Sequence, residues 1–570
     1  MTVFFNGRLW VSPATMSVVD DTAMANRNLS VGNVVALIGR AGGGEPNKAL
    51  RFGNPSQAIE TLRSGELLTA VLKAFDPSSQ TGGPAEVVAV RVNPALQSLL
   101  TLEDAAANNV ISLKSTDYGL HTNQIKVKVE SGSVVGKKVT TDFGLAYYSE
   151  DNIHRNAFSI AYVGAGAATI SVTNSTVSLK VDAAAVATIA LADYPTVQQL
   201  VDRINVIADF TADVLDGNGN QEALNGLDSL TDQAVTGTPY TVTANLQAIV
   251  DWINSTSEGF VTATREANAG AVPANIGYTY LSGGSDGVVT NAEWQNAFTT
   301  LQTVDVQWVV PVSGDSSIHA MADTHVAFMS NVGRMERRAI VGMVSGTTDD
   351  AAIDAAKAIN SDRTSLVHLG FYDYDANGKL VLMEPYILAA LLAGAFSGVN
   401  PGTALTNKTI KVRGLERDLR NPTDTDQLIN GGVLCVENTN SGFKVVKSIS
   451  TWLVNDNYNR VEVSTGVATD FVARNVRQAL DVLRGERGNP ITLSRAVSIA
   501  ESTLRELARP EPQGLGVIVG DVANPAYKNI VASLEGDVLR VEFQCSPVIP
   551  VNYIPVTIFA VPYSGTATAA

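Results

Sequence analysis

The feature that most constrains the fold is an interrupted alternation of strands and helices. Residues 33–39 and 86–92 are continuous apolar runs, typical of strands buried on both faces, and a helical pattern at 55–75 lies between them. The alternation stops there and resumes only at residue 292. Because a strand–helix–strand unit normally forms a parallel pair, the sequence predicts one α/β core domain assembled from two separated pieces.

The second piece of this core is predicted to contain helices and strands in strict alternation. The helices are expected at 292–301, 318–333, 350–360 and 386–397, and the strands at 304–312, 338–344 and 364–372. Pro385 falls in the first turn of the last helix, where proline is tolerated because no N–H is needed.

The segment between the two pieces, residues 115–282, has a different character. Thr, Ser, Val, Gly and Ala dominate, and short alternating stretches such as 125–129 are typical of half-buried strands. Helical patterns interrupt it at 196–207 and 244–254. We expect a β-rich inserted region of one or two lobes.

The predicted fold class is therefore α/β (α+β) and multidomain, with a discontinuous α/β core domain, inserted β-rich domain or domains, and extended terminal arms. The length of 570 residues fits three or four domains. The expected boundaries are an N-terminal arm at 1–30, core at 31–114, an inserted region at 115–285, core again at 286–425, a C-terminal core domain at 426–548 and a C-terminal arm at 549–570.

The two ends of the chain carry apolar strand patterns that need a partner. Asn6-Gly7 between apolar segments is a strong hairpin signal, and an isolated hairpin is barely stable in water. Residues 551–561 are apolar on both faces, and Pro555 places them at a sheet edge or a gap in pairing. The candidate residues for such a contact, in this subunit or another, are Val3, Phe5, Leu9, Val11, Val551, Tyr553, Ile554, Val556, Ile558 and Phe559.

Charge and hydropathy argue against several classes of protein. The net charge is −16, from 40 basic and 56 acidic residues, and no Lys/Arg-rich run occurs. Direct nucleic-acid binding is therefore not expected. The longest apolar run, 386–393, is too short to span a bilayer, and no signal peptide is recognised, so no direct membrane insertion is expected. Cys435 and Cys545 are interpreted as reduced core residues.

One motif fits a calcium-binding loop. Asp373, Asp375, Asn377 and Glu384 match the D-x-[DN]-x-[DN]-G-x5-E pattern. An EF-hand needs a helix on each side, yet 365–372 is strand-like and Pro385 follows the last ligand. We interpret the motif as a hairpin that turns at Asn377-Gly378, and we predict no metal.

Two glycine-rich motifs resemble catalytic ones without their context. Residues 283–287 match G-x-S-x-G around Ser285, but no helix follows at once, as a nucleophile elbow requires. Residues 39–44 resemble the start of a phosphate-binding loop, but Glu45 stands where a lysine is needed. We therefore predict no catalytic residues and no cofactor.

The last two helical patterns are amphipathic. The second one keeps Val497, Ala500, Leu504 and Leu507 on one face and ends at Pro510. Its other face carries arginines, which are either a solvated surface or an electrostatic docking surface for an acidic partner. The candidate docking residues are Arg495, Arg505 and Arg509.

The order of these landmarks resembles that of contractile bacteriophage tail sheath proteins. The resemblance runs from strand 34–38 and Arg51-Phe52-Gly53-Asn54 through 194–205 and the loop 281–287 to 428–433 and Thr451-Trp452. It covers nearly the whole chain through order and spacing, although no single motif is specific. One departure is Ile449-Ser450-Thr451, where the family often has an Arg-Thr pair.

The resemblance implies a structural subunit, not an enzyme. Such subunits lend terminal strands to neighbours, polymerise helically around a tail tube and contract to drive the tube through the host envelope. The implied partners are further copies of the chain, the tail tube protein, and the baseplate and tail terminator proteins, in a virion tail assembled in the host cytoplasm. The implied tube-facing residues are Arg495, Arg505 and Arg509. Alternatives are the sheath of a pyocin-like or secretion-system particle, a serine hydrolase using Ser285, and a calcium-binding adhesion protein.

Overall fold

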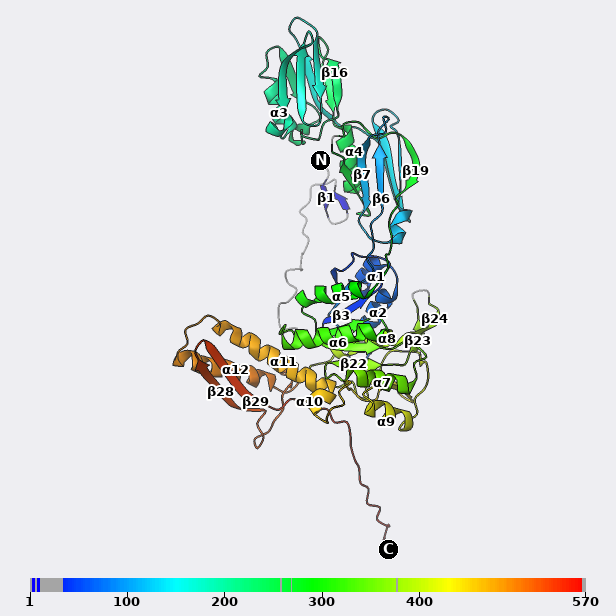
Figure 1. The fold of residues 1–570 in the computed structure, drawn as a ribbon, viewed down its shortest axis with the longest axis vertical. Coiled ribbons are helices and arrows are strands. Elements are labelled where there is room, and N and C mark those ends of the chain that lie inside the picture. Colours follow the sequence, from blue (N-terminus) through cyan, green and yellow to red (C-terminus); the bar gives the residue numbers. More distant parts are fainter. Residues whose placement is uncertain are drawn as a thin grey trace, which may run out of the picture.

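The computed structural model describes residues 34–256, 259–267, 269–375 and 378–565, together with the backbone of 3–5 and 8–10. The described chain is elongated (Figure 1). An outer β lobe and an inner β lobe follow one another along the long axis, the α/β core comes next, and a helical C-terminal domain lies beside the core.

The core sheet joins the two pieces of the predicted discontinuous domain. Its strand order is β22-β21-β20-β3-β5-β4. β3 (Val34–Gly39) pairs in parallel with β5 (Glu86–Arg91) on one side and with β20 (Trp308–Pro311) on the other. The predicted fold class is thereby confirmed. The remaining strands are β4 (Ala49–Phe52), which is antiparallel, β21 (Arg338–Gly342) and β22 (Thr364–Val367).

Helices cover both faces of this sheet, so its strands are apolar throughout. Val35 and Leu37 of β3 face one apolar cluster, and Ala36 and Ile38 face the other, as the two-residue period of a strand requires. The first cluster includes residues of α1 (Pro55–Leu62), α2 (Glu66–Phe75) and α8 (Pro385–Ser397). The second includes residues of α5 (Asn291–Thr300), α6 (Ser316–Asn331), α7 (Asp349–Ile359) and α9 (Thr423–Asn430).

One predicted strand of the core is wrong in its extent. The expected strand 364–372 is two strands, because β22 ends at Val367 and β23 (Phe371–Tyr374) belongs to another sheet with β24 (Leu380–Met383) and β25 (Gly414–Leu415). The chain turns at Gly370, whose N–H donates to the Glu416 carboxylate at 2.8 Å. A carboxylate from a distant segment thus ends the run, and apolar patterning alone does not reveal it.

The inserted region forms two lobes with separate apolar clusters. The inner lobe packs α4 (Asn245–Thr256) with the sheets β18-β7-β6 and β10-β9-β8-β19. These strands are β6 (Leu99–Glu103), β7 (Asn109–Ser115), β8 (Lys126–Ser131), β9 (Lys137–Phe143), β10 (Ala146–Ile153), β18 (Val261–Arg265) and β19 (Ile276–Tyr280).

The outer lobe packs α3 (Val197–Ile204) with two further sheets, β15-β11-β17 and β14-β13-β12-β16. The strands are β11 (Asn156–Tyr162), β12 (Ala168–Val172), β13 (Thr176–Val181), β14 (Ala184–Ala190), β15 (Phe210–Val214), β16 (Leu230–Ala234) and β17 (Tyr240–Thr243). Alternating burial along β12 reflects the alternating sequence that predicted a β-rich region.

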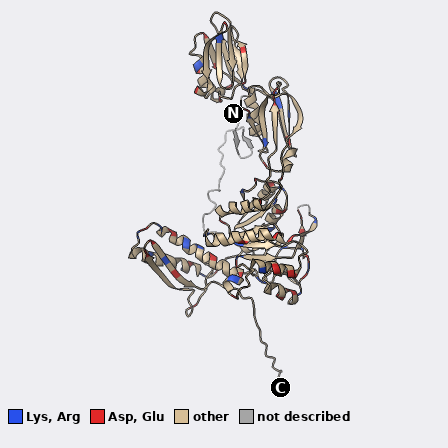
Figure 2. Ribbon diagram, in the orientation of Figure 1, with Lys and Arg blue, Asp and Glu red and all other residues tan. Residues whose placement is uncertain are grey.

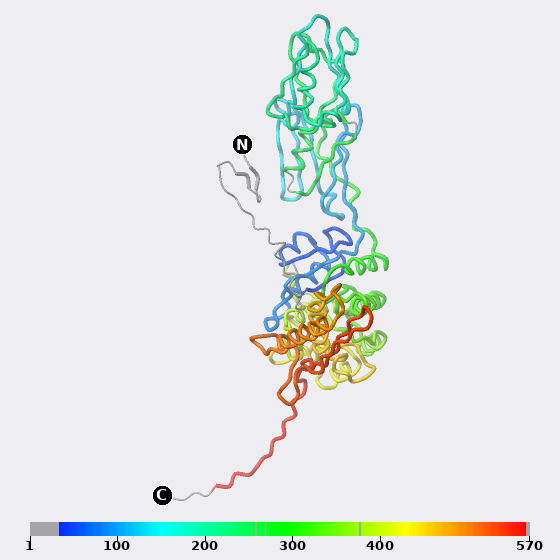
Figure 3. The backbone as a smooth tube through the Cα atoms, turned by 90° about the vertical axis from the view of Figure 1, so that its left-hand side faces the viewer, coloured from blue at the N-terminus to red at the C-terminus, as the bar shows by residue number. Residues whose placement is uncertain are grey.

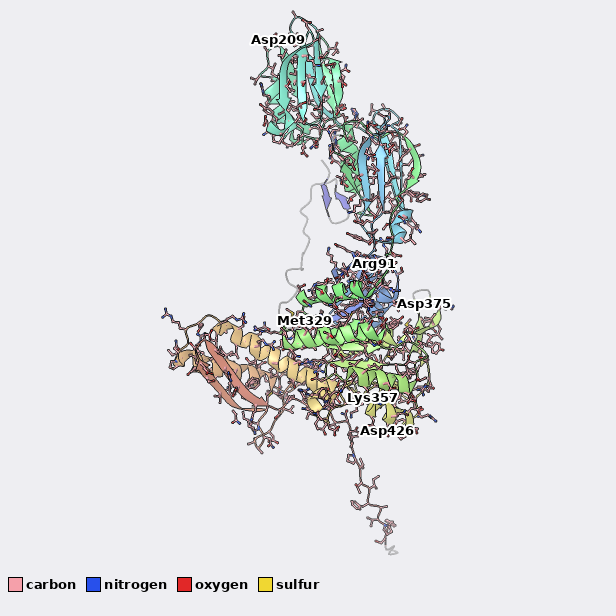
Figure 4. All side chains as sticks on the ribbon, in the orientation of Figure 1. Arg91, Asp209, Met329, Lys357, Asp375 and Asp426 are labelled. Carbon is pink, nitrogen blue, oxygen red and sulfur yellow. The ribbon has the colours of Figure 1, made fainter. Side chains whose placement is uncertain are left out.

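A buried arginine fastens the inner lobe to the core. Arg91 at the end of β5 is fully buried and donates to the Gly44 and Tyr118 carbonyls at 2.9 Å each, and to Asp286 at 3.1 Å. Figure 4 places Arg91 where the core meets the lobes. Nearby, the outgoing and returning segments bond to each other, Leu96 to Ser285 and Leu99 to Ser282. The insertion therefore leaves and rejoins the core at one point.

The C-terminal domain is held to the core by an ionic cluster. It contains α10 (Tyr458–Val461), α11 (Val463–Leu480), α12 (Pro490–Leu507), β28 (Tyr527–Glu535) and β29 (Val538–Cys545). A small hairpin of β26 (Val436–Thr439) and β27 (Gly442–Val445) precedes it. Asp470 of α11 lies 2.6 Å from Arg363 and 3.2 Å from buried Arg338 of the core. Burial raises the pKa of the Cys435 thiol to about 12, and neither cysteine is in a disulfide.

Across the described residues, no helix combines the length and the apolar character needed to cross a bilayer.

The close approach of α2 and α8 gives a test of core packing. A methyl group at Gly394 would collide with the backbone carbonyl of Ala74. Gly394→Ala should therefore destabilise the protein by about 1–3 kcal/mol in chemical unfolding, despite alanine's better helix propensity. At Gly53 a methyl group would meet no atom within 4 Å, so Gly53→Ala is the matched control. Equal stability of both variants would contradict this packing.

Candidate functional site: the assembly surfaces

The C-terminal arm is the most exposed apolar segment of the described chain. Residues 549–565 are extended and form no paired strand, and Figures 1 and 3 both show them leaving the body of the protein. The exposed fractions of the predicted arm residues run from 74% for Val556 to 85% for Phe559. The predicted strand 551–561 thus has the sequence of a strand but is not paired with any strand of the described part of the chain.

The root of the arm is tied to the C-terminal domain. Asn552 donates to the Glu462 carboxylate at 3.1 Å, and Lys447 donates to the Tyr553 hydroxyl at 3.3 Å while lying over its ring. Glu462 is 2% exposed, and burial raises the pKa of its carboxyl group. A cleft of about 620 Å³ adjoins these contacts. The arm therefore starts from a fixed point and is free beyond Tyr553.

The N-terminal hairpin is also present. β1 (Val3–Phe5) and β2 (Arg8–Trp10) pair antiparallel, Val3 with Trp10 and Phe5 with Arg8. This pairing confirms the predicted hairpin. The predicted turn at Asn6-Gly7 and the arm residue Val11 lie outside the described residues. The role of Val3, Phe5 and Leu9 between subunits stays a prediction.

The sheet of β28 and β29 has only two strands among the described residues. Its inner face packs on α11 and α12 through side chains that include Ile530 and Phe543. Residues 517–519 bond to 546–548, just beyond the end of β29. The outer edges of β28 and of β29 itself have no paired strand in the part of the chain described. A two-stranded sheet of this kind offers backbone groups to a further strand.

The predicted docking arginines of α12 are largely neutralised by neighbouring carboxylates. Each is paired with a glutamate near it in sequence: Arg505 with Glu501 at 2.8 Å, Arg509 with Glu506 at 3.1 Å, and Arg495 with Glu486. The spacings i, i+4 and i, i+3 of the first two pairs are visible in the sequence. Figure 2 shows both basic and acidic residues on the helices of the C-terminal domain. The surface is mixed, not uniformly basic.

The calcium-like motif is distributed along a hairpin. β23 and β24 pair antiparallel, with Asp373 opposite Val381 and Phe371 opposite Met383. Asp375 therefore lies near the turn and Glu384 at the opposite end, about 17 Å away along the strands. Asp373 is paired with Lys73 at 2.5 Å, and Glu384 accepts from the Ser345 N–H at 2.7 Å. Asn377 lies outside the described residues. No calcium-loop geometry is formed by the three described carboxylates.

The two glycine-rich motifs have structural roles. The backbone amides of Gly42 and Gly43 donate to the carbonyls of Ser64 and Leu62, and that of Gly44 donates to Asp117. These donors are already used, so they do not cradle a phosphate. Ser285 lies in the returning segment that bonds to Leu96, and no helix begins immediately after it. Among the described residues no cluster of three or more His, Cys, Asp or Glu side chains is arranged to hold a metal.

The fold and the free arm indicate a multidomain structural protein. Comparison with known proteins agrees with this class. No family model matches the chain. The chain is 28% identical to the tail sheath protein of Bacillus phage SP01, covering 99% of this chain and 98% of that one. It is 26% identical to the tail sheath protein of Staphylococcus phage Twort, covering 81% and 84%.

A solved sheath protein shares the fold. The sheath tail protein Lin1278 from Listeria innocua superposes with a TM-score of 0.54 over 90% of this chain and 92% of that one, at 13% identity. The resemblance to contractile phage tail sheath proteins inferred from the sequence is therefore confirmed. The predicted function, that of a structural subunit of a contractile tail sheath, is confirmed with it.

The exposure of the arm predicts that it contributes nothing to the stability of its own subunit. A chain ending at Tyr553 keeps the root contacts, and every described residue that it loses is exposed. Its free energy of unfolding should match that of the full chain within about 0.5 kcal/mol. Thermal or urea unfolding, at concentrations where both chains are monomeric, checks this. A large loss of stability would place the arm against its own subunit.

Proposed function

We propose that this chain polymerises helically around a tail tube, that its contraction drives the tube through a host envelope, and that it does so without catalysis or a cofactor. The observation that carries the proposal is the unpaired apolar arm at 549–565. Similarity to phage tail sheath proteins over nearly the whole chain supports it. The protein is then a virion component assembled in the host cytoplasm, and its further partners are the baseplate and tail terminator proteins.

The arm is proposed to add a strand to the β28–β29 sheet of a neighbouring subunit. The free part of the arm, residues 554 through 565, has 12 residues and spans about 40 Å when extended, enough to reach an adjoining neighbour. Main-chain bonds would supply affinity, and alternate side chains would set the register. Fully burying each Val, Ile or Phe contributes about 1.5–3 kcal/mol. Such contacts are heterologous and propagate into a helix of subunits instead of closing a ring of two.

The body of the subunit is proposed to move as a unit during contraction. α11 is clamped to the core by Asp470 between Arg338 and Arg363, and by Arg474 at 2.8 Å from Asp305. Glu336 is 7% exposed and is paired with Arg477. Breaking buried pairs of this kind is costly. Flexibility would then be confined to the arm beyond Tyr553, which links neighbours while the bodies turn.

The arm can be tested by electron microscopy of the isolated protein. The full chain is expected to form hollow tubes, and both a chain ending at Tyr553 and the variant Ile554→Ser/Val556→Ser/Ile558→Ser should fail to do so. These three positions share one face of an extended strand. Val134→Ser/Val163→Ser/Val206→Ser removes similarly exposed apolar groups from the lobes and should leave tubes intact. Tubes from the truncated chain would refute the arm mechanism.

The predicted tube-facing residues Arg495, Arg505 and Arg509 are proposed to contact the tail tube. Reversing all three to Glu places like charges beside Glu486, Glu501 and Glu506 and should weaken assembly on purified tail tubes, most strongly at low salt. Replacing the same three arginines with Gln is the control, because it removes the attraction to the tube without adding repulsion. This variant should weaken assembly to an intermediate extent. Assembly unchanged by the Glu variant would exclude α12 as the tube contact.

A further inference from the structure

A buried carboxyl group lies at the root of the C-terminal arm. Glu462 follows α10 and directly precedes α11, and its side chain is 2% exposed. It lines the cleft of about 620 Å³ that the arm root, residues 549–553, also lines. Figure 1 shows the arm leaving the body of the protein beside α10. Glu462 therefore belongs to the joint between the body and the arm.

Glu462 has no charged partner within ion-pair distance in the described part of the chain. Its two oxygens accept hydrogen bonds from neutral groups, the Asn552 side-chain amide and the Ser464 hydroxyl, at 3.1 Å each. Burying a carboxylate without a counter-ion is costly, so such a group tends to keep its proton. Burial is the largest influence on the pKa of Glu462 and raises it, although the hydrogen-bond donors and Lys447 favour the ionised form.

The side-chain amide of Asn552 is only half satisfied by an ionised Glu462. Its nitrogen donates to the carboxyl group, but its oxygen Oδ1 is buried and accepts no hydrogen bond from the described residues. A carboxylate has no proton to give, whereas a protonated carboxyl group offers one O–H donor and still accepts. A buried acceptor without a partner is destabilising. An acid–amide pair satisfies both groups of Asn552, so the unpartnered oxygen and the burial both favour a protonated Glu462.

Four other titratable groups among the described residues line this cleft: Lys447, Asp456, Tyr458 and Tyr553. Asp456, Tyr458 and Tyr553 are exposed, and Lys447 donates to the Tyr553 hydroxyl at 3.3 Å. The positive end of the α11 dipole favours an ionised Glu462, as Lys447 does. These influences oppose burial, so a change of pH can move the proton on or off Glu462.

We propose that Glu462 and Asn552 form a proton-controlled latch at the arm root. With Glu462 protonated, the acid–amide pair holds Asn552 against the body and fixes the direction in which the arm leaves. With Glu462 ionised, the buried charge draws water into the cleft and Asn552 is released. The consequence for assembly rests on the proposed role of the arm: tubes form more readily at lower pH, because a held root keeps the arm aimed at the neighbouring subunit.

The mobility of the arm root tests the latch in the monomer. A nitroxide label on Val551→Cys, in a chain that also carries Cys545→Ser, reports motion beside Asn552 through its electron paramagnetic resonance spectrum. The latch is closed below the raised pKa of Glu462 and opens as the pH rises through it. In dilute, monomeric protein the label should therefore be immobile at about pH 5 and mobile at about pH 8. Equal mobility at both pH values overturns the proposal.

Three variants separate this latch from other titrations. In Glu462→Gln, an uncharged amide both accepts from Asn552 and donates to its Oδ1 at every pH, so the label should stay immobile throughout. Asn552→Leu, outside the helices and strands, should leave the label mobile throughout. Asp456→Asn removes an exposed carboxylate from the same cleft and is the matched control, which should respond to pH as wild type does. A pH response in Glu462→Gln, or its loss in Asp456→Asn, would assign the switch to another group and overturn the proposal.

Tube formation by the full chain measures the consequence for assembly. Raising the pH from about 5 to about 8 should raise the lowest protein concentration that gives tubes about tenfold for wild type, equivalent to about 1.4 kcal/mol, and should not change it for Glu462→Gln. An unchanged wild-type concentration with a responsive label would show that the latch does not control assembly, which overturns the proposal and leaves the role of the arm intact. No tubes at any pH with a responsive label would support the latch and contradict the proposed function instead.

Discussion

The parallel pairing of β3 with both β5 and β20 is the interaction on which the rest of the structure depends. It places the first piece of the chain at the centre of a sheet whose other strands come from beyond the insertion. Alternate residues of β3 then enter two separate apolar clusters, which bury helices on each face of the sheet. Neither piece of the core could bury its apolar strands without the other.

This arrangement separates three tasks along the chain. The lobes leave and return at adjacent segments beside Arg91, so they project without disturbing the sheet. The ionic cluster around Asp470 joins the C-terminal domain to the core. The arm is attached through Asn552 and Tyr553, and its described residues beyond Tyr553 are exposed. A rigid body that carries an arm anchored at its root and flexible beyond it is what a subunit needs if neighbouring subunits are to turn without separating.

Much of the fold could be predicted from the sequence, because buried strands and amphipathic helices leave clear periodic patterns. The discontinuous core follows from the resumed alternation at residue 292, and the free arm from apolar residues at 551–561. Long-range polar contacts leave no such pattern. The carboxylate of Glu416, which meets the N–H of Gly370, ends a predicted strand from far away.

The sequence predicts some of the candidate assembly residues better than others. The arm can be recognised in the sequence because an exposed apolar strand is costly. The prediction that the arginines of α12 form a docking surface overlooked their partners Glu501 and Glu506. Helical spacing alone reveals both of these ion pairs. The calcium motif matches letter by letter, yet an antiparallel hairpin spreads its carboxylates apart. Sequence spacing decides a site only when the backbone between the residues is also known.

The most direct test of strand addition between subunits is amide hydrogen exchange of residues 554–565, compared between the monomer and assembled tubes. Rapid exchange is predicted in the monomer, since no backbone partner is present, and strong protection in tubes, since the arm then lies in a neighbour's sheet. Equal, rapid exchange in both states would contradict strand addition as the link between subunits.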